Sequence, residues 1–158
     1  MRIATGRARA FGLACSLSAI VACSAATPAA PARQQAAGAP LENTRMQMTI
    51  GAHAFTVELA DTAAARAFAA RLPFTLDMAE LNGNEKHADI HPALPVDAQR
   101  PGTIRAGDVM LYGANTIVVF YRTFPSSYRY TWLGRVQNID GLAEVLGPGG
   151  VRVVFARD

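Results

Sequence analysis

The chain has 158 residues, which is enough for one domain with a buried hydrophobic core. It carries 15 Lys and Arg residues against 12 Asp and Glu residues, a formal net charge of +3. Arg2, Arg7 and Arg9 account for three of the basic residues, and the remaining 12 balance the 12 acids. No cluster of basic residues follows them, which excludes the phosphate-neutralising face that nucleic-acid binding requires.

Both cysteines lie near the N-terminus, at Cys15 and Cys23. The rest of the chain therefore has no disulfide, no thiol nucleophile and no cysteine ligand for a metal. We expect the domain to be stabilised by its core alone.

The first 22 residues have the pattern of a signal peptide. The arginines of residues 1–10 precede an apolar stretch at residues 11–22, which is too short to span a bilayer. We therefore predict an exported protein with a signal peptide at residues 1–22.

The end of this segment, Ile20-Val21-Ala22-Cys23, resembles the bacterial lipobox. The resemblance implies that Cys23 is lipidated and becomes the mature N-terminus. Ser24 follows in place of the Asp that marks inner-membrane retention, which favours an outer-membrane lipoprotein facing the periplasm. The alternative is an ordinary signal peptide cleaved after a small residue such as Ala26.

Residues 23–41 are rich in Ala, Pro, Gly and Gln and offer little to bury. We predict a disordered tether here and a folded domain at residues 42–158. Contact with the membrane is expected through the lipid anchor only.

The first half of the domain alternates between strand and helix signals. Residues 45–59 show two period-2 apolar runs around Gly51, which predicts a β-hairpin. Residues 61–72 change to helical spacing, with Asp61 or Thr62 as the cap. A strand at residues 74–79 ends at an Asn82-Gly83 turn, and the prolines of residues 88–101 predict a long covering loop.

Residues 107–136 hold the only tryptophan and all four tyrosines. We predict strands at residues 109–112, 116–121 and 128–136, the second buried on both faces. A short helix near residues 141–146 and a strand at residues 151–155 complete the chain. Six or seven short strands with one or two helices favour a mainly β fold, closed as a barrel.

The order of motifs resembles the bacterial cyclophilin-like family, a group without an assigned function. The matching elements are the hairpin, Leu72-Pro73-Phe74-Thr75, Met78, Leu81-Asn82-Gly83, Glu85-Lys86, Gly107-Asp108-Val109, Leu111-Tyr112, Phe120-Tyr121-Arg122-Thr123-Phe124, Leu133-Gly134-Arg135-Val136 and Gly141-Leu142. One departure is His87, where an aromatic residue is expected. The resemblance implies a closed cyclophilin-like barrel of roughly eight strands.

The resemblance does not imply prolyl isomerase activity, because the Gln-Gly-Gly-Asp segment and the setting of the catalytic arginine in true cyclophilins are missing. We expect a protein that binds a small molecule or a peptide segment. The alternative is a divergent peptidyl-prolyl isomerase that uses Arg122 and neighbouring aromatic residues. No cofactor is predicted.

Several residues are candidates for a ligand site. Tyr128, Tyr130 and Trp132 alternate on one predicted strand and would form an aromatic row. The candidate ligand-binding residues are Glu85, Tyr112, Phe120, Tyr121, Arg122 and Tyr130. A structural role is the alternative for Glu85, which could accept hydrogen bonds from turn amides near Gly83 or pair with an arginine. For Asp108 we expect stabilisation of its turn through backbone amides. His87 and His91 are four residues apart, but Pro92 disfavours the helix that would let them share a metal, and no metal site is predicted.

Overall fold

The computed structural model describes residues 45–158. The predicted signal peptide, Cys23 and the tether lie outside these residues. The strands are β1 (Arg45–Ile50), β2 (His53–Leu59), β3 (Phe74–Leu81), β4 (Glu85–Asp89), β5 (Gly102–Ile104), β6 (Asp108–Tyr112), β7 (Thr116–Phe120), β8 (Phe124–Ser126), β9 (Tyr130–Val136) and β10 (Val151–Arg157). The helices are α1 (Ala63–Ala69) and α2 (Leu142–Leu146).

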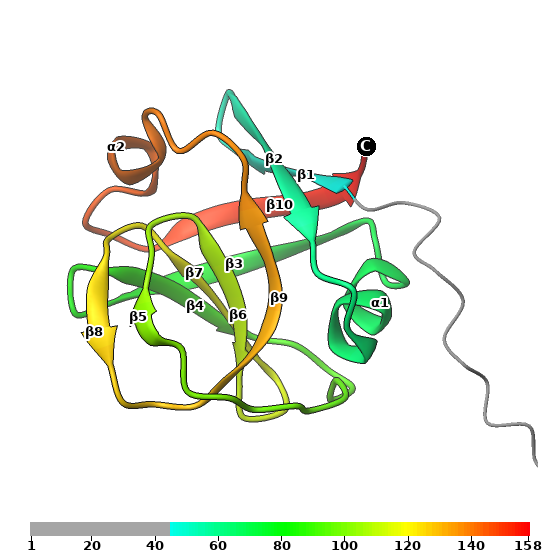
Figure 1. Cartoon of the computed structure of the whole chain (residues 1–158). Helices are drawn as coiled ribbons and strands as arrows, with labels where there is room; N and C mark the ends of the chain where they lie inside the picture. The colour runs from blue at the N-terminus through cyan, green and yellow to red at the C-terminus, as the bar shows by residue number, and fades with distance from the viewer. Residues whose placement is uncertain (1–44) are drawn as a thin grey trace, which may run out of the picture. The chain divides into compact units, whose positions relative to one another are not determined.

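Eight of the strands form a closed antiparallel barrel in the order β1-β10-β3-β4-β7-β6-β9-β2 (Figure 1). β5 and β8 pair separately as a two-stranded ribbon. The predicted barrel is therefore confirmed. The count of six or seven strands was too low, because β4 carries few apolar residues and β5 and β8 are only three residues long.

The N-terminal hairpin forms as predicted and supplies one side of the barrel core. Met46, Met48 and Ile50 are buried, and the chain turns at Gly51, which has a φ of +58°. Such a positive φ is open to glycine at no steric cost. No helix in the described residues is long and apolar enough to cross a membrane.

Helix α1 is shorter than the predicted span of residues 61–72. Thr62 is the N-cap, and its hydroxyl oxygen accepts a hydrogen bond from the Ala65 backbone N–H at 3.0 Å. Phe68 packs edge-on against Phe74 and Phe155, with ring centroids 5.2 and 5.6 Å apart. This contact fixes α1 against the barrel core.

Strand β7 is buried on both faces, as predicted. Ile117 and Val119 point into the barrel core, whereas Val118 and Phe120 belong to a second apolar group on the outer face. The buried members of this outer cluster are Ile104, Met110, Val118, Phe120 and Tyr130, with Phe124 and Trp132 packed against it. The β5–β8 ribbon covers part of the outer cluster through Ile104 and Phe124.

The connection from β4 to β5 is the predicted covering loop, although it begins at Ile90 rather than at residue 88. Ile90 and Leu94 are buried in the barrel core, at 7% and 4% exposure. The Arg71 guanidinium donates hydrogen bonds to the carbonyl oxygens of Pro92 and Ala93. These contacts fix the loop to the barrel.

Gly134 is required where β2 and β9 close the barrel. Its partner in the β2–β9 register is Leu59, and a Cβ at position 134 would collide with the carbonyl oxygen of Glu58. On the other side of β9, the register with β6 shifts between Val109 and Met110. The strand therefore bends at this seam.

Candidate functional site

A groove of about 490 Å³ lies on the outer face of the barrel. Its volume is within the range of small-ligand sites. Glu85, His87, Asp89, Thr116 and Val118 come from β4 and β7, and Leu81, Asn82 and Asn84 from the end of β3 and its turn. Tyr112, Phe124, Tyr128 and Tyr130 contribute aromatic rings. We call this set the outer groove.

The strand register brings the polar groups of β4 to the outer groove. Glu85 pairs with Phe120, and Asp89 pairs with Thr116. The Thr116 hydroxyl donates a hydrogen bond to the Asp89 carboxylate at 2.6 Å. Because side chains alternate along a strand, Glu85, His87 and Asp89 share the outer face while Lys86 points inward.

The aromatic rings of the outer groove meet at an angle. The Tyr112 ring centroid lies 5.6 Å from that of Tyr130 and 6.3 Å from that of Tyr128, with interplanar angles of 53° and 83°. Tyr130 also packs edge-on against Phe120 at 5.4 Å. Tyr112 and Tyr128 are 47% and 63% exposed, so ring surface remains open to a ligand.

This arrangement corrects the predicted row of Tyr128, Tyr130 and Trp132 in part, since Tyr130 and Trp132 do share the outer face of β9. Tyr128 precedes β9, and Trp132 lines a different depression, where it packs under the Arg135 guanidinium at 5.2 Å. The third tyrosine of the groove is Tyr112, which cross-strand pairing with Tyr130 brings there.

Glu85 is the most unusual group in the outer groove. It is only 8% exposed, yet its carboxylate accepts no hydrogen bond and forms no ion pair with the residues that the structure describes. Burial raises the pKa of Glu85 above its usual value, and the negative charge of Glu80 raises it further. A buried acid without a partner is unfavourable for folding, which makes Glu85 a candidate for ligand contact.

Asn84, which also lines this groove, has a buried oxygen, Oδ1, without a hydrogen-bond partner within residues 45–158. No sequence pattern predicted a role for Asn84. Only the turn geometry could have suggested it, because Asn84 is the residue that connects the Asn82-Gly83 turn to β4.

The expected structural role of Glu85 was wrong. The turn amide of Gly83 donates its hydrogen bond to Glu80 Oε1, at 2.7 Å, and no arginine pairs with Glu85. Asp108, in contrast, stabilises its turn as expected by accepting a hydrogen bond from the Arg105 amide, and it also pairs with Arg135.

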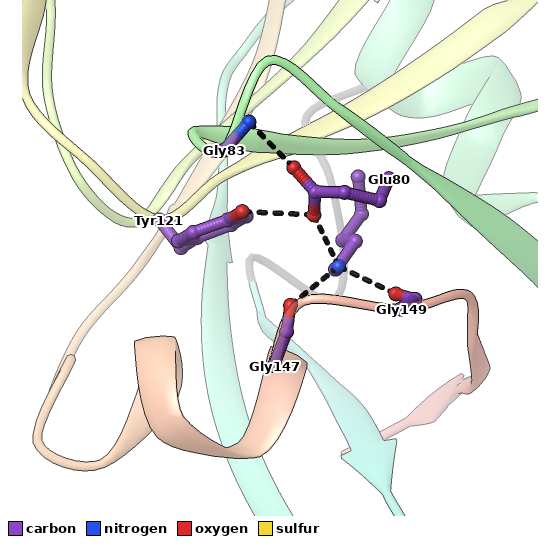
Figure 2. Close-up of polar contacts among 6 residues, drawn as sticks. Glu80, Gly83, Tyr121, Gly147 and Gly149 are labelled. Carbon is purple, nitrogen blue, oxygen red and sulfur yellow. Dashed lines mark hydrogen bonds and ion pairs between the residues drawn. The ribbon is translucent and has the colours of Figure 1, made fainter.

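The chain's only lysine, Lys86, is fully buried behind Glu85. Its ammonium group forms an ion pair with Glu80 and donates hydrogen bonds of 2.6 Å to the carbonyl oxygens of Gly147 and Gly149. Figure 2 shows these acceptors and Tyr121 around the ammonium group. Since all three ammonium protons have acceptors, Lys86 is a structural residue.

Glu80 and Tyr121 complete this network. The Tyr121 hydroxyl donates to Glu80 Oε2 at 2.8 Å. Burial alone would raise the pKa of Glu80, but the hydrogen bonds from Lys86, Tyr121 and Gly83 outweigh it and lower that pKa. Burial and the Glu80 carboxylate raise the pKa of Tyr121 to about 12. Tyr121 is thus held in its neutral, donating form.

The structure separates the six candidate residues. Glu85, Tyr112 and Tyr130 line the outer groove together. Burial raises the pKa of Tyr130 to about 12, and the negative charge of Glu85 contributes to this shift. Phe120 is fully buried in the outer cluster. Tyr121 and the exposed Arg122 line a separate depression beside α2. Arg122 therefore does not share a surface with the tyrosines of the groove.

The two histidines considered for metal binding lie in different elements. His87 is in β4, and His91 is exposed in the following loop. Among residues 45–158, no group of three His, Cys, Asp or Glu side chains could hold a metal ion.

The family match agrees with the fold. Residues 48–156 match the cyclophilin-like family, and the chain belongs to that family. The solution structure of a hypothetical protein from Archaeoglobus fulgidus is similar, with 23% sequence identity and a TM-score of 0.49. The similarity covers 73% of this chain and 95% of that protein. A search of curated proteins found no match.

Replacing Lys86 with Met should destabilise the fold by about 3–5 kcal/mol, because it breaks the ion pair with the partly buried Glu80 and leaves the carbonyl oxygens of Gly147 and Gly149 without their donor. Urea unfolding at pH 7 measures the loss. The matched control is Arg152→Met, which breaks an ion pair at the surface. The side chains of Arg152 and Asp77 in that pair are 71% and 72% exposed. The control should lose far less stability, and equal losses would contradict the structural role of Lys86.

Replacing Glu85 with Gln should stabilise the protein at neutral pH by about 0.5–2 kcal/mol, because it removes an unpaired buried charge. The folded-state pKa of Glu85 is raised, so the folded protein binds this proton more tightly than the unfolded chain does. The stability of the parent relative to the variant is therefore lost as pH rises from the ordinary value of 4.5 through the folded pKa.

The free energy of unfolding of parent and variant, measured from about pH 3.5 to pH 7, tests this sign. The two curves should converge at the acidic end. Glu144→Gln, which changes an exposed acid on α2, serves as the control without such convergence. A variant less stable than the parent at neutral pH would show that Glu85 has a stabilising partner.

Proposed function

We propose that this protein is a lipid-anchored binding protein of the bacterial cell envelope. Its outer groove binds a small molecule or a peptide segment, and no catalytic step is assigned to it. The observation that carries the proposal is that Glu85, 8% exposed and without a partner among the described residues, lines the same groove as the exposed rings of Tyr112 and Tyr128.

The energetics of the groove support binding. Burying a polar group without a partner is unfavourable, and native proteins rarely retain such groups without a reason. Here Glu85 is 8% exposed, has no partner among the described residues and lines the groove beside Tyr112 and Tyr130. A ligand that supplied a partner for this carboxylate would remove the cost on binding.

The aromatic side chains support the same proposal. Tyrosine rings provide apolar contact area together with a polar hydroxyl, a combination typical of binding sites. Tyr112 and Tyr128 keep about half or more of their surface exposed, although each has a neighbour to pack against. Their exposed rings can therefore contact a ligand with little rearrangement of the barrel.

The envelope location is supported by the N-terminal sequence. The apolar segment at residues 11–22 and Ile20-Val21-Ala22-Cys23 are typical of a lipoprotein signal. A lipidated Cys23 followed by the tether at residues 23–41 would hold the barrel close to the periplasmic face of the outer membrane. Stable anchoring needs more than one acyl chain, which lipoprotein modification supplies.

We expect ligand binding to map onto the outer groove. A fragment library screened by ¹H–¹⁵N NMR against the full chain should shift the amide signals of Glu85, Tyr112 and Tyr130. Tyr112→Ala should weaken the binding of such fragments about tenfold, because it removes an exposed aromatic contact surface. Arg152→Ala on β10 is the control, and shifts that cluster away from the groove would refute the proposed site.

We also expect Cys23 to determine the location of the protein. The full chain expressed in a Gram-negative bacterium should fractionate with the outer membrane, and mass spectrometry should find an acylated N-terminus. Cys23→Ser should prevent acylation, while Cys15→Ser, inside the apolar segment, should not. A mature N-terminus beyond Cys23 in the parent would rule out the lipid anchor.

A further inference from the structure

The charges that line the outer groove have one sign. Glu85 and Asp89 contribute carboxylates, and no lysine or arginine of the described chain lines it. Asp89 is partnered by Thr116, but Glu85 is 8% exposed and has no such partner. We propose that the outer groove selects small organic cations, ligands that carry a quaternary or protonated ammonium group. This inference rests on the proposed binding function and specifies its ligand class.

The aromatic wall suits the same ligand. A cation over the face of a tyrosine or phenylalanine ring is attracted by the negative face of the ring. The rings of Tyr112 and Tyr128 are nearly perpendicular, with an interplanar angle of 83°, and those of Tyr112 and Tyr130 are tilted by 53°. Rings at such angles present surfaces to a ligand from different directions, as in aromatic cages for ammonium groups.

The alternatives to a cation fit the groove less well. An anionic ligand would be repelled by Glu85, and a neutral one could donate a hydrogen bond to that carboxylate but would bring no opposite charge. A metal ion would need several hard ligands, and residues 45–158 hold no group of three His, Cys, Asp or Glu side chains that could bind one. An organic cation satisfies both the carboxylate and the rings.

The closed barrel favours a small molecule over an extended peptide. β4 is paired with β3 and β7, and β6 is paired with β7 and β9. The barrel strands that line the groove therefore have no free edge to which a peptide strand could add. The groove of about 490 Å³ has the size of a small-ligand site.

Choline and its neutral isostere 3,3-dimethylbutan-1-ol are the matched probes. Titrated into the purified full chain and followed by NMR, choline should shift the groove signals and bind at least about tenfold more tightly than the isostere. n-Butylammonium compared with butan-1-ol repeats the comparison for a protonated amine. Equal affinity of cation and neutral isostere in both pairs would overturn the inference.

Two variants locate the effect in the groove. Glu85→Gln should lower the affinity for choline about tenfold or more while leaving the isostere unchanged, and the variant should fold because it removes an unfavourable charge. Tyr112→Ala should also weaken choline binding. Glu144→Gln, an exposed acid on α2, is the control. Full choline affinity in Glu85→Gln would overturn the role of the carboxylate.

The remaining outcomes separate this inference from the proposed function. If neutral fragments bind the groove and neither cation does, the binding function stands and cation selection fails. If a capped Gly-Lys-Gly peptide binds about tenfold more tightly than choline or n-butylammonium, the ligand is a peptide and the small-molecule inference fails. If no probe or fragment binds the groove, both proposals fail.

Discussion

The ion pair between the buried Lys86 and the partly buried Glu80 is the interaction on which the candidate site depends. It joins β4 to β3, and the hydrogen bonds from Lys86 to Gly147 and Gly149 add the connection from α2 to β10. A lysine in the barrel interior is tolerated only where all its protons have acceptors, so this network favours one register of β4. Because neighbouring residues of a strand point to opposite faces, the same register sets Glu85 on the outside.

The two faces of β4 therefore differ in how well their charges are satisfied. On the inner face, Lys86 has three acceptors and Glu80 receives hydrogen bonds from Lys86, Tyr121 and Gly83. On the outer face, Glu85 has no partner in the described structure although it is almost as deeply buried. The unfavourable electrostatics of β4 are therefore concentrated in the outer groove, where Glu85 is unpaired, because Lys86 on the inner face is fully satisfied. Such local exceptions are typical of functional sites.

Periodicity predicted the parts of the fold in which apolar residues repeat. The β1–β2 hairpin, the doubly buried β7 and the Asn82-Gly83 turn were recognised in this way. β4 gave no such signal, because its deeply buried inward residue is a lysine. The glutamate that accepts the turn amide was misassigned, since Glu80 and Glu85 flank the same turn and only the folded geometry distinguishes them. The aromatic wall was predicted in part: Tyr112 joins Tyr130 through the pairing of β6 with β9, which spacing along one strand cannot reveal.

The barrel's own packing explains why a binding site would form on its outer face. An eight-stranded barrel has an interior just wide enough for side chains, and here Met46, Met48, Val57, Val119 and Phe155 fill it at 0% exposure. The outer cluster gives the barrel a second apolar layer, which the β5–β8 ribbon covers only in part. The groove lies where Phe124 from β8 and Tyr128 from the next loop meet the polar face of β4. Changes in the segment from β8 to β9 would then alter ligand choice without disturbing the core, because that segment contributes to the groove and supplies no residue to the barrel interior before β9 begins.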